Sequence, residues 1–133
     1  MTFIKYYLIT ALVFLCIDFV WLSAAAENLY RKQIGFLMKD NFNFTAAIIF
    51  YLFFAGGLLF FVINKAVADS SWQYALFAGM FFGFITYSTY DMTNYATIKD
   101  WPLMITVIDI IWGSFLCGLT SFLSYHIINY FEI

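Results

Sequence analysis

The feature that most constrains this chain is a set of long apolar segments, each of a length that can cross a lipid bilayer. They cover residues 4–26, 45–66, 72–98 and 102–131. A bilayer core takes about 20 residues of helix, and a helix satisfies its own backbone hydrogen bonds in lipid. Hydrophobic residues make up 65% of the chain and charged residues only 11%, against about 25% charged in soluble domains. We predict an all-α membrane protein with four transmembrane helices in a compact antiparallel bundle, forming one domain over residues 1–133.

The connection between the first two segments is long and of mixed polarity. Residues 27–44 place Arg31, Lys32 and Lys39 among apolar side chains. This mixture is typical of a helix that lies in the headgroup region of a bilayer. We therefore predict a short interfacial helix between the first and second transmembrane helices, with an ordinary loop as the alternative.

An even number of spans places both termini on one face of the membrane, here named side A, and the first and third connections on the opposite face, side B. Four of the six Lys and Arg residues belong to side B. Positive charge favours the cytoplasm, so side B is expected to be cytoplasmic.

Three acidic residues lie inside the apolar segments, where each costs about 2.5 to 3.5 kcal/mol on insertion scales and is by default a functional candidate. Asp18 lies eight residues from the side B end of its segment, and Asp91 and Asp109 lie seven from theirs. These separations correspond to roughly 10 to 12 Å of helix. Tyr51 of the second segment reaches the same level. We predict that the three carboxyl groups converge near side B.

The third segment is unusually polar around Asp91. Helical spacing puts Tyr87, Asp91 and Asn94 on one stripe, with Tyr90 beside it. Such a stripe must face protein or water. The alternative is purely structural, because polar groups also hold membrane helices together.

A short internal repeat links the first and last segments. Residues 17–23 and 108–114 are identical at four of seven positions, and each copy carries Asp followed three residues later by Trp. In antiparallel helices the two copies face one another, so the indoles of Trp21 and Trp112 are candidate donors to Asp18 and Asp109. Chance similarity of a short string is the alternative.

Glycine spacing points to close helix packing. Gly79 and Gly83 form a small-xxx-small pattern on the third segment, and Gly56 and Gly57 lie in the middle of the second. Small residues let membrane helices approach each other, although the pattern is common and says nothing specific about function.

Five groups of residues resemble a known family. They are Asp18-Phe19-Val20-Trp21-Leu22, Tyr30-Arg31 with Gly35, Phe50-Tyr51 leading to Gly57-Leu58, the string Thr-Tyr-Asp-x-Thr-Asn-x-Ala-Thr at residues 89–97 continuing to Trp101-Pro102-Leu103, and Asp109-Ile110-Ile111-Trp112-Gly113. The chain resembles, over nearly its whole length, small bacterial integral membrane proteins classified as domain of unknown function, family 2177. The resemblance implies four transmembrane helices in a bacterial inner membrane and carries no activity with it.

The remaining chemistry of the chain is sparse. His126 is far from the carboxylates, and Cys16 and Cys117 lie on different segments, so no metal motif or cofactor is expected. Six basic residues form no dense basic surface for nucleic acid. Arg31, just outside the first segment on side B, is either placed at the mouth of the carboxylate site or anchors the helix at the interface.

These residues favour transport or binding of a small cation or proton-linked solute at the carboxylate cluster, in a protein whose other partners are the lipid bilayer and a second copy of itself. Two alternatives stay open. One is a membrane-embedded enzyme with Asp91 and Asp109 as acid and base, and the other is a non-catalytic binding or assembly subunit for a lipid-like or aromatic ligand.

Overall fold

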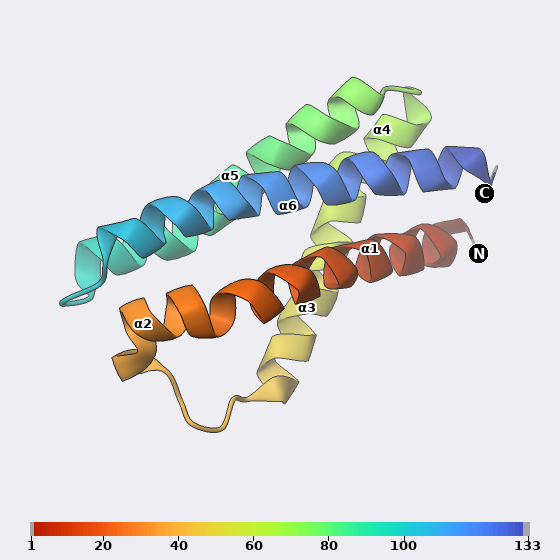
Figure 1. The fold of residues 1–133 in the computed structure, drawn as a ribbon. Helices are drawn as coiled ribbons and strands as arrows, with labels where there is room; N and C mark the ends of the chain where they lie inside the picture. The colour runs from red at the N-terminus through yellow and green to blue at the C-terminus, as the bar shows by residue number, and fades with distance from the viewer. Residues whose placement is uncertain (1, 132–133) are drawn as a thin grey trace.

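A computed structural model describes residues 2–131 of the chain, and this part is helical without any strand. The elements in chain order are α1 (Thr2–Ala25), a π-helical turn (Ala26–Tyr30), α2 (Arg31–Ile34), a 3₁₀ turn (Gly35–Leu37), α3 (Phe44–Leu58), a second π-helical turn (Leu59–Ile63), α4 (Asn64–Ala68), α5 (Trp72–Thr97) and α6 (Leu103–Tyr130). The second π turn joins α3 and α4 into one continuous helix. The four predicted segments are therefore confirmed as four long helices (Figure 1).

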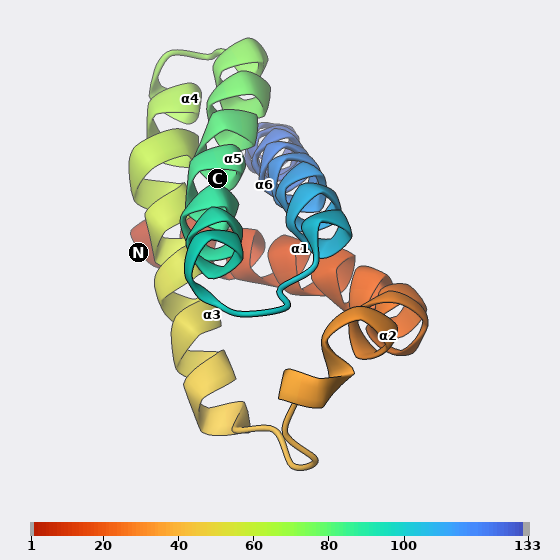
Figure 2. The same ribbon diagram turned by 90° about the vertical axis from the view of Figure 1, so that its left-hand side faces the viewer.

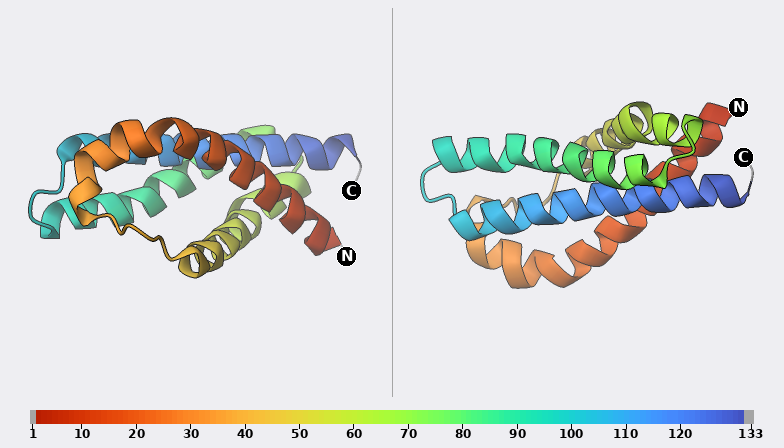
Figure 3. Two further views of the ribbon diagram at one scale, coloured as in Figure 1. Left: turned by 60° about the horizontal axis from the view of Figure 1, so that its bottom comes forward. Right: turned by 90° about the horizontal axis from the view of Figure 1, so that it is seen from above.

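Three of the long helices are apolar enough to cross a membrane by length and composition: Thr2–Leu37, Phe44–Ala68 and Leu103–Tyr130. The fourth, α5, is as long but more polar, because its second half carries the Thr, Tyr and Asp residues of the 89–97 string. It runs antiparallel beside α6 along most of its length (Figure 3).

Local signals explain where the helices begin. The side chains of Asn43 and Ser71 each accept a 3.0 Å hydrogen bond from the backbone N–H three residues further on, which caps α3 and α5. Pro102 precedes α6, where its missing N–H leaves no bond unmade. Ser70 and Asp100 take positive φ angles of 51° and 64° in the two tight turns, and Asp is among the residues that tolerate this conformation.

The connection after α1 differs in form from the predicted separate helix. It is helical as far as Leu37, but it continues from α1 through the π turn and α2. No glycine or proline interrupts residues 26–34, so nothing ends the helix before Gly35. A short irregular stretch then leads back to α3 (Figure 1). That this part lies in the headgroup region stays a prediction.

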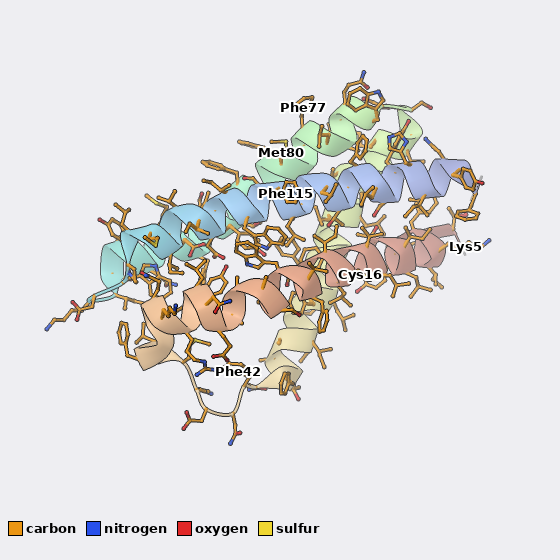
Figure 4. The ribbon with its side chains drawn as sticks, in the orientation of Figure 1. Lys5, Cys16, Phe42, Phe77, Met80 and Phe115 are labelled. Atoms are coloured by element: carbon orange, nitrogen blue, oxygen red, sulfur yellow. The ribbon has the colours of Figure 1, made fainter. Side chains whose placement is uncertain are left out.

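The packing is uneven around the bundle. The α5–α6 pair makes the most extensive contact and α1 packs on the other flank of α6 (Figure 3). The middle of α3 contacts α1, and the first half of α3 leans away from α5 and α6 toward the α1–α3 connection (Figure 2). The core where the helices meet is aliphatic and aromatic: Phe14, Phe54, Leu58, Leu59, Val62, Ile63, Leu116 and Ile128. The outer surface carries exposed apolar side chains such as Phe77, Met80 and Phe115 (Figure 4), as lipid contact requires.

Both ends of the described chain lie at one end of the bundle (Figure 1), so the topology can be tested in cells. With Cys16 and Cys117 replaced by alanine, cysteines introduced at Lys39 and Lys99 should react with a membrane-impermeant maleimide from the same side. A cysteine at Lys5, near the N-terminus (Figure 4), should react from the other side. Labelling of the Lys39 and Lys99 replacements from opposite sides would contradict this arrangement.

Candidate functional site

The three buried carboxyl groups of the long helices line one cavity of about 330 Å³ near side B. Asp18 comes from α1, Asp91 from α5 and Asp109 from α6, and their exposed fractions are 6%, 0% and 7%. The α1–α3 connection contributes Ile34, Met38 and Phe42 to the lining. The aromatic residues of the lining are Trp21, Tyr30, Phe42, Tyr51, Tyr87, Tyr90, Trp101 and Trp112. The structure thus brings together carboxyl groups as many as 91 positions apart in the chain, from Asp18 to Asp109.

Asp18 is held by two neutral donors. The hydroxyl of Tyr51 donates to one carboxyl oxygen at 2.6 Å, and Nε1 of Trp112 donates to the other at 3.4 Å. A hydrogen bond to a charged carboxylate is shorter and stronger than one between neutral groups; the Tyr51 bond has this short length, and the Trp112 bond is longer and weaker. Asp18 is therefore compensated for much of the hydration that it loses.

Asp109 is linked to an indole by two consecutive hydrogen bonds through Tyr30, here called the Tyr30 relay, and not by a direct contact. Tyr30 donates its hydroxyl proton to Oδ1 of Asp109 at 2.5 Å, and the same hydroxyl accepts a 3.1 Å bond from Nε1 of Trp21. Sequence reasoning placed Tyr30 outside the site, because the first span was expected to end at residue 26. The continued helix carries Tyr30 back over the cavity.

The internal repeat forms a pair of crossed contacts. The indole rings of Trp21 and Trp112 stack with centroids 4.5 Å apart and planes at 11°. Trp112 donates a hydrogen bond to Asp18, the aspartate of the opposite copy. Trp21 donates to the Tyr30 hydroxyl, which in turn donates to Asp109. The two repeat copies thus face each other, and each indole stabilises the other helix's carboxyl group.

Asp91 differs from the other two carboxyl groups. It is fully buried, and neither of its oxygens accepts a hydrogen bond from a donor within residues 2–131. The carboxyl group of Asp109 lies within hydrogen-bonding reach of it. Two carboxyl groups can bond only if a proton or a cation lies between them, since two carboxylates repel. The indole N–H of Trp101, buried in the same lining, also lacks an acceptor in this part of the chain.

Two of the candidate residues stay outside the cavity. Arg31 is exposed and pairs with Glu27 at 3.0 Å, one turn earlier on the same helix. Asn94 is half-buried and does not line the cavity. Among the described residues no three His, Cys, Asp or Glu side chains are placed to hold one metal ion.

Comparison with known proteins decides the family. A family described as predicted membrane protein (DUF2177) matches residues 3–126 of the chain. The chain belongs to this family. No curated protein and no solved structure matches the chain. The membership confirms the resemblance carried by the sequence motifs, and every residue of the cavity lining lies within the matched range.

The Tyr30 relay can be tested by stability. Replacing Tyr30 with Phe removes the donor to Asp109 and the acceptor of Trp21 together, so we expect the free energy of unfolding to fall by about 1 to 3 kcal/mol. Arg31→Lys is the neighbouring control, and it should change stability by less than about 0.5 kcal/mol because the Glu27 pair is exposed. Thermal denaturation in detergent micelles measures both. Equal losses in the two variants would argue against the relay.

Proposed function

We propose that this protein binds a small cation at the carboxylate cavity and moves it across the bacterial inner membrane in exchange for protons. The observation that carries the proposal is Asp91, a fully buried carboxyl group that lines a cavity and receives no hydrogen bond from residues 2–131. A buried charge without a partner is strongly unfavourable. A ligand that pairs with Asp91 explains why the protein keeps an aspartate at this buried position.

The charge balance of the lining favours a cation. The lining contains three aspartates and no Lys or Arg, and the donors that reach Asp18 and Asp109 are neutral hydroxyl and indole groups. Aromatic faces add favourable contacts for a cation, worth about 2 kcal/mol or more when the cation is desolvated. An anionic or strongly acidic solute would be repelled.

A purely structural role for the cluster is less well supported. In an assembly subunit we expect every carboxyl oxygen to be satisfied by Trp and Tyr donors with no cavity beside them. Asp18 fits that description, but Asp91 does not, and about 330 Å³ of space adjoins it. The enzyme alternative has no additional observation in its favour.

Proton linkage follows from the Asp91–Asp109 pair. In the absence of solute a proton shared between the facing carboxyl groups relieves their repulsion. A bound cation replaces that proton, which leaves toward the open side of the cavity. Four helices are too few to enclose a full path, so we expect transport to involve a homodimer.

The proposal is tested by direct binding of two probes, sodium chloride and ethylammonium chloride, to the full chain in lipid nanodiscs. Three of the four tryptophans line the cavity, so intrinsic fluorescence reports occupancy. We expect saturable binding of at least one probe, weakened tenfold or more by Asp91→Asn. The matched control Asp100→Asn removes an exposed carboxyl group in the α5–α6 turn and should leave binding unchanged. No saturable binding, or binding insensitive to Asp91→Asn, would overturn the proposal.

The pH dependence has a definite sign. Because proton and cation compete for the same carboxyl pair, the apparent affinity for the probe should fall as pH is lowered. Acidification of a lightly buffered nanodisc sample on addition of probe should accompany binding. Affinity that rises as pH falls would contradict exchange of a proton for the cation.

A further inference from the structure

A second cavity adjoins the carboxylate cavity and differs from it in character. It measures about 470 Å³ and is lined by Phe50 and Phe54 of α3, by Thr86, Tyr87 and Tyr90 of α5, and by Asp109. Tyr87, Tyr90 and Asp109 also line the first cavity. Apart from the edge at Asp109, its walls are largely aromatic carbon. The two cavities are therefore neighbours that share three lining residues. The first cavity is acidic and the second is apolar.

The second cavity opens toward lipid. It lies where α3 leans away from α5 (Figure 2). Phe50 and Tyr90, one on each side, are 54% and 56% exposed. Both residues belong to the long helices and not to the connections on side B. A molecule dissolved in the bilayer can therefore reach this cavity sideways, without passing through water.

We propose that the ligand is an amphiphilic alkylammonium compound, whose charged head occupies the carboxylate cavity and whose hydrocarbon chain lies in the cavity between α3 and α5. This inference rests on the proposed function and names its substrate class. The charged head would pair with Asp91, which has no donor within residues 2–131, and would lie against the stacked indoles of Trp21 and Trp112. The hydrocarbon chain of the ligand would fill the apolar cavity, which a compact inorganic ion would leave empty.

The geometry also assigns the order of contacts. A chain entering between α3 and α5 meets Phe50 and Tyr90 first, and Asp109, which lines both cavities, is the first carboxyl group in its path. The head then reaches Asp91 behind it.

The test is photo-crosslinking of the full chain in nanodiscs with a dodecylammonium probe that carries a diazirine at the end of its chain, followed by peptide mass spectrometry. We expect adducts concentrated on Phe50, Phe54 and Thr86. They should fall at least tenfold in Asp91→Asn, which removes the attraction for the head, and in Thr86→Trp, which fills the second cavity. The control Phe77→Trp places the same indole side chain on the outer face of α5 (Figure 4) and should have no effect.

The outcomes separate this inference from the proposed function. If sodium or ethylammonium binds in an Asp91-dependent manner but dodecyl adducts scatter over lipid-facing residues such as Phe77 and Phe115, the amphiphile is excluded and the proposed function stands. If a neutral dodecanol diazirine labels the same residues equally well, the ammonium head is not recognised and the inference fails. If none of the probes depends on Asp91, both proposals fail.

Discussion

Replacing Gly83 with alanine is expected to lower the free energy of unfolding by about 3 kcal/mol, at the upper end of the usual cost of overpacking. A β-carbon at this position would overlap the carbonyl group of Gly113 and come within 2.9 Å of Cβ of Cys117. The obstacle is backbone, so no rotamer change can make room. The α5–α6 pair, the most extensive contact in the bundle, would have to separate.

Gly56→Ala provides the matched control, since a β-carbon there meets only the Tyr7 ring at 3.7 Å. That distance is ordinary van der Waals contact, so stability should stay the same or rise slightly because alanine favours the helix over glycine. Thermal denaturation in the same micelles compares the two variants. A Gly83→Ala protein as stable as Gly56→Ala would mean that α5 and α6 do not approach as closely as described.

The same substitution at two aspartates is expected to change stability in opposite directions. Asp91→Asn replaces a buried carboxyl group that has no donor within residues 2–131 and supplies an amide N–H to Asp109 in place of the shared proton, so stability should rise by about 1 kcal/mol. Asp18→Asn weakens the hydrogen bonds from Tyr51 and Trp112 and sets an amide N–H against one of these donors. Its cost should be about 1.5 to 3 kcal/mol.

The contrast is informative because both residues are buried carboxyl groups on long helices that line the same cavity. If Asp91→Asn raises the free energy of unfolding but abolishes the binding of cation probes, the native aspartate contributes to ligand binding and lowers the stability of the fold. If both variants lose stability equally, Asp91 has a structural partner and the argument for a vacant acceptor is wrong. Unfolding in micelles at pH 7 measures both variants against wild type.

The helices could be predicted from sequence because a bilayer imposes a length on each apolar run. The depth of Asp18, Asp91 and Asp109 followed from counting residues inward from the helix ends, and the structure places all three on one cavity. The facing of the repeat copies followed from antiparallel direction alone. These inferences depend on position along a helix, which a periodic sequence encodes directly.

The features that the sequence did not indicate depend on how the helices bend, tilt and rotate relative to one another. Tyr30 reaches Asp109 only because α1 continues past its apolar run and bends through a π turn, and no local pattern marks that continuation. Arg31 was a candidate for the cavity mouth by proximity, yet helical phase turns it toward Glu27. Asn94 shares a stripe with Asp91, but it lies one turn nearer side B and does not line the cavity. The second cavity arises from the tilt of α3, which residue spacing does not fix.

The polar character of α5 has a consequence for how the protein is made. By length and composition α6 is apolar enough to cross a membrane, and α5 is the less apolar of the two helices. The turn at residues 98–102 is short, and the glycines of α5 let the two backbones touch along their shared face. We therefore expect the α5–α6 hairpin, and not α5 alone, to be the unit that passes from the translocon into lipid. In that case α5 is held at the translocon until α6 has emerged.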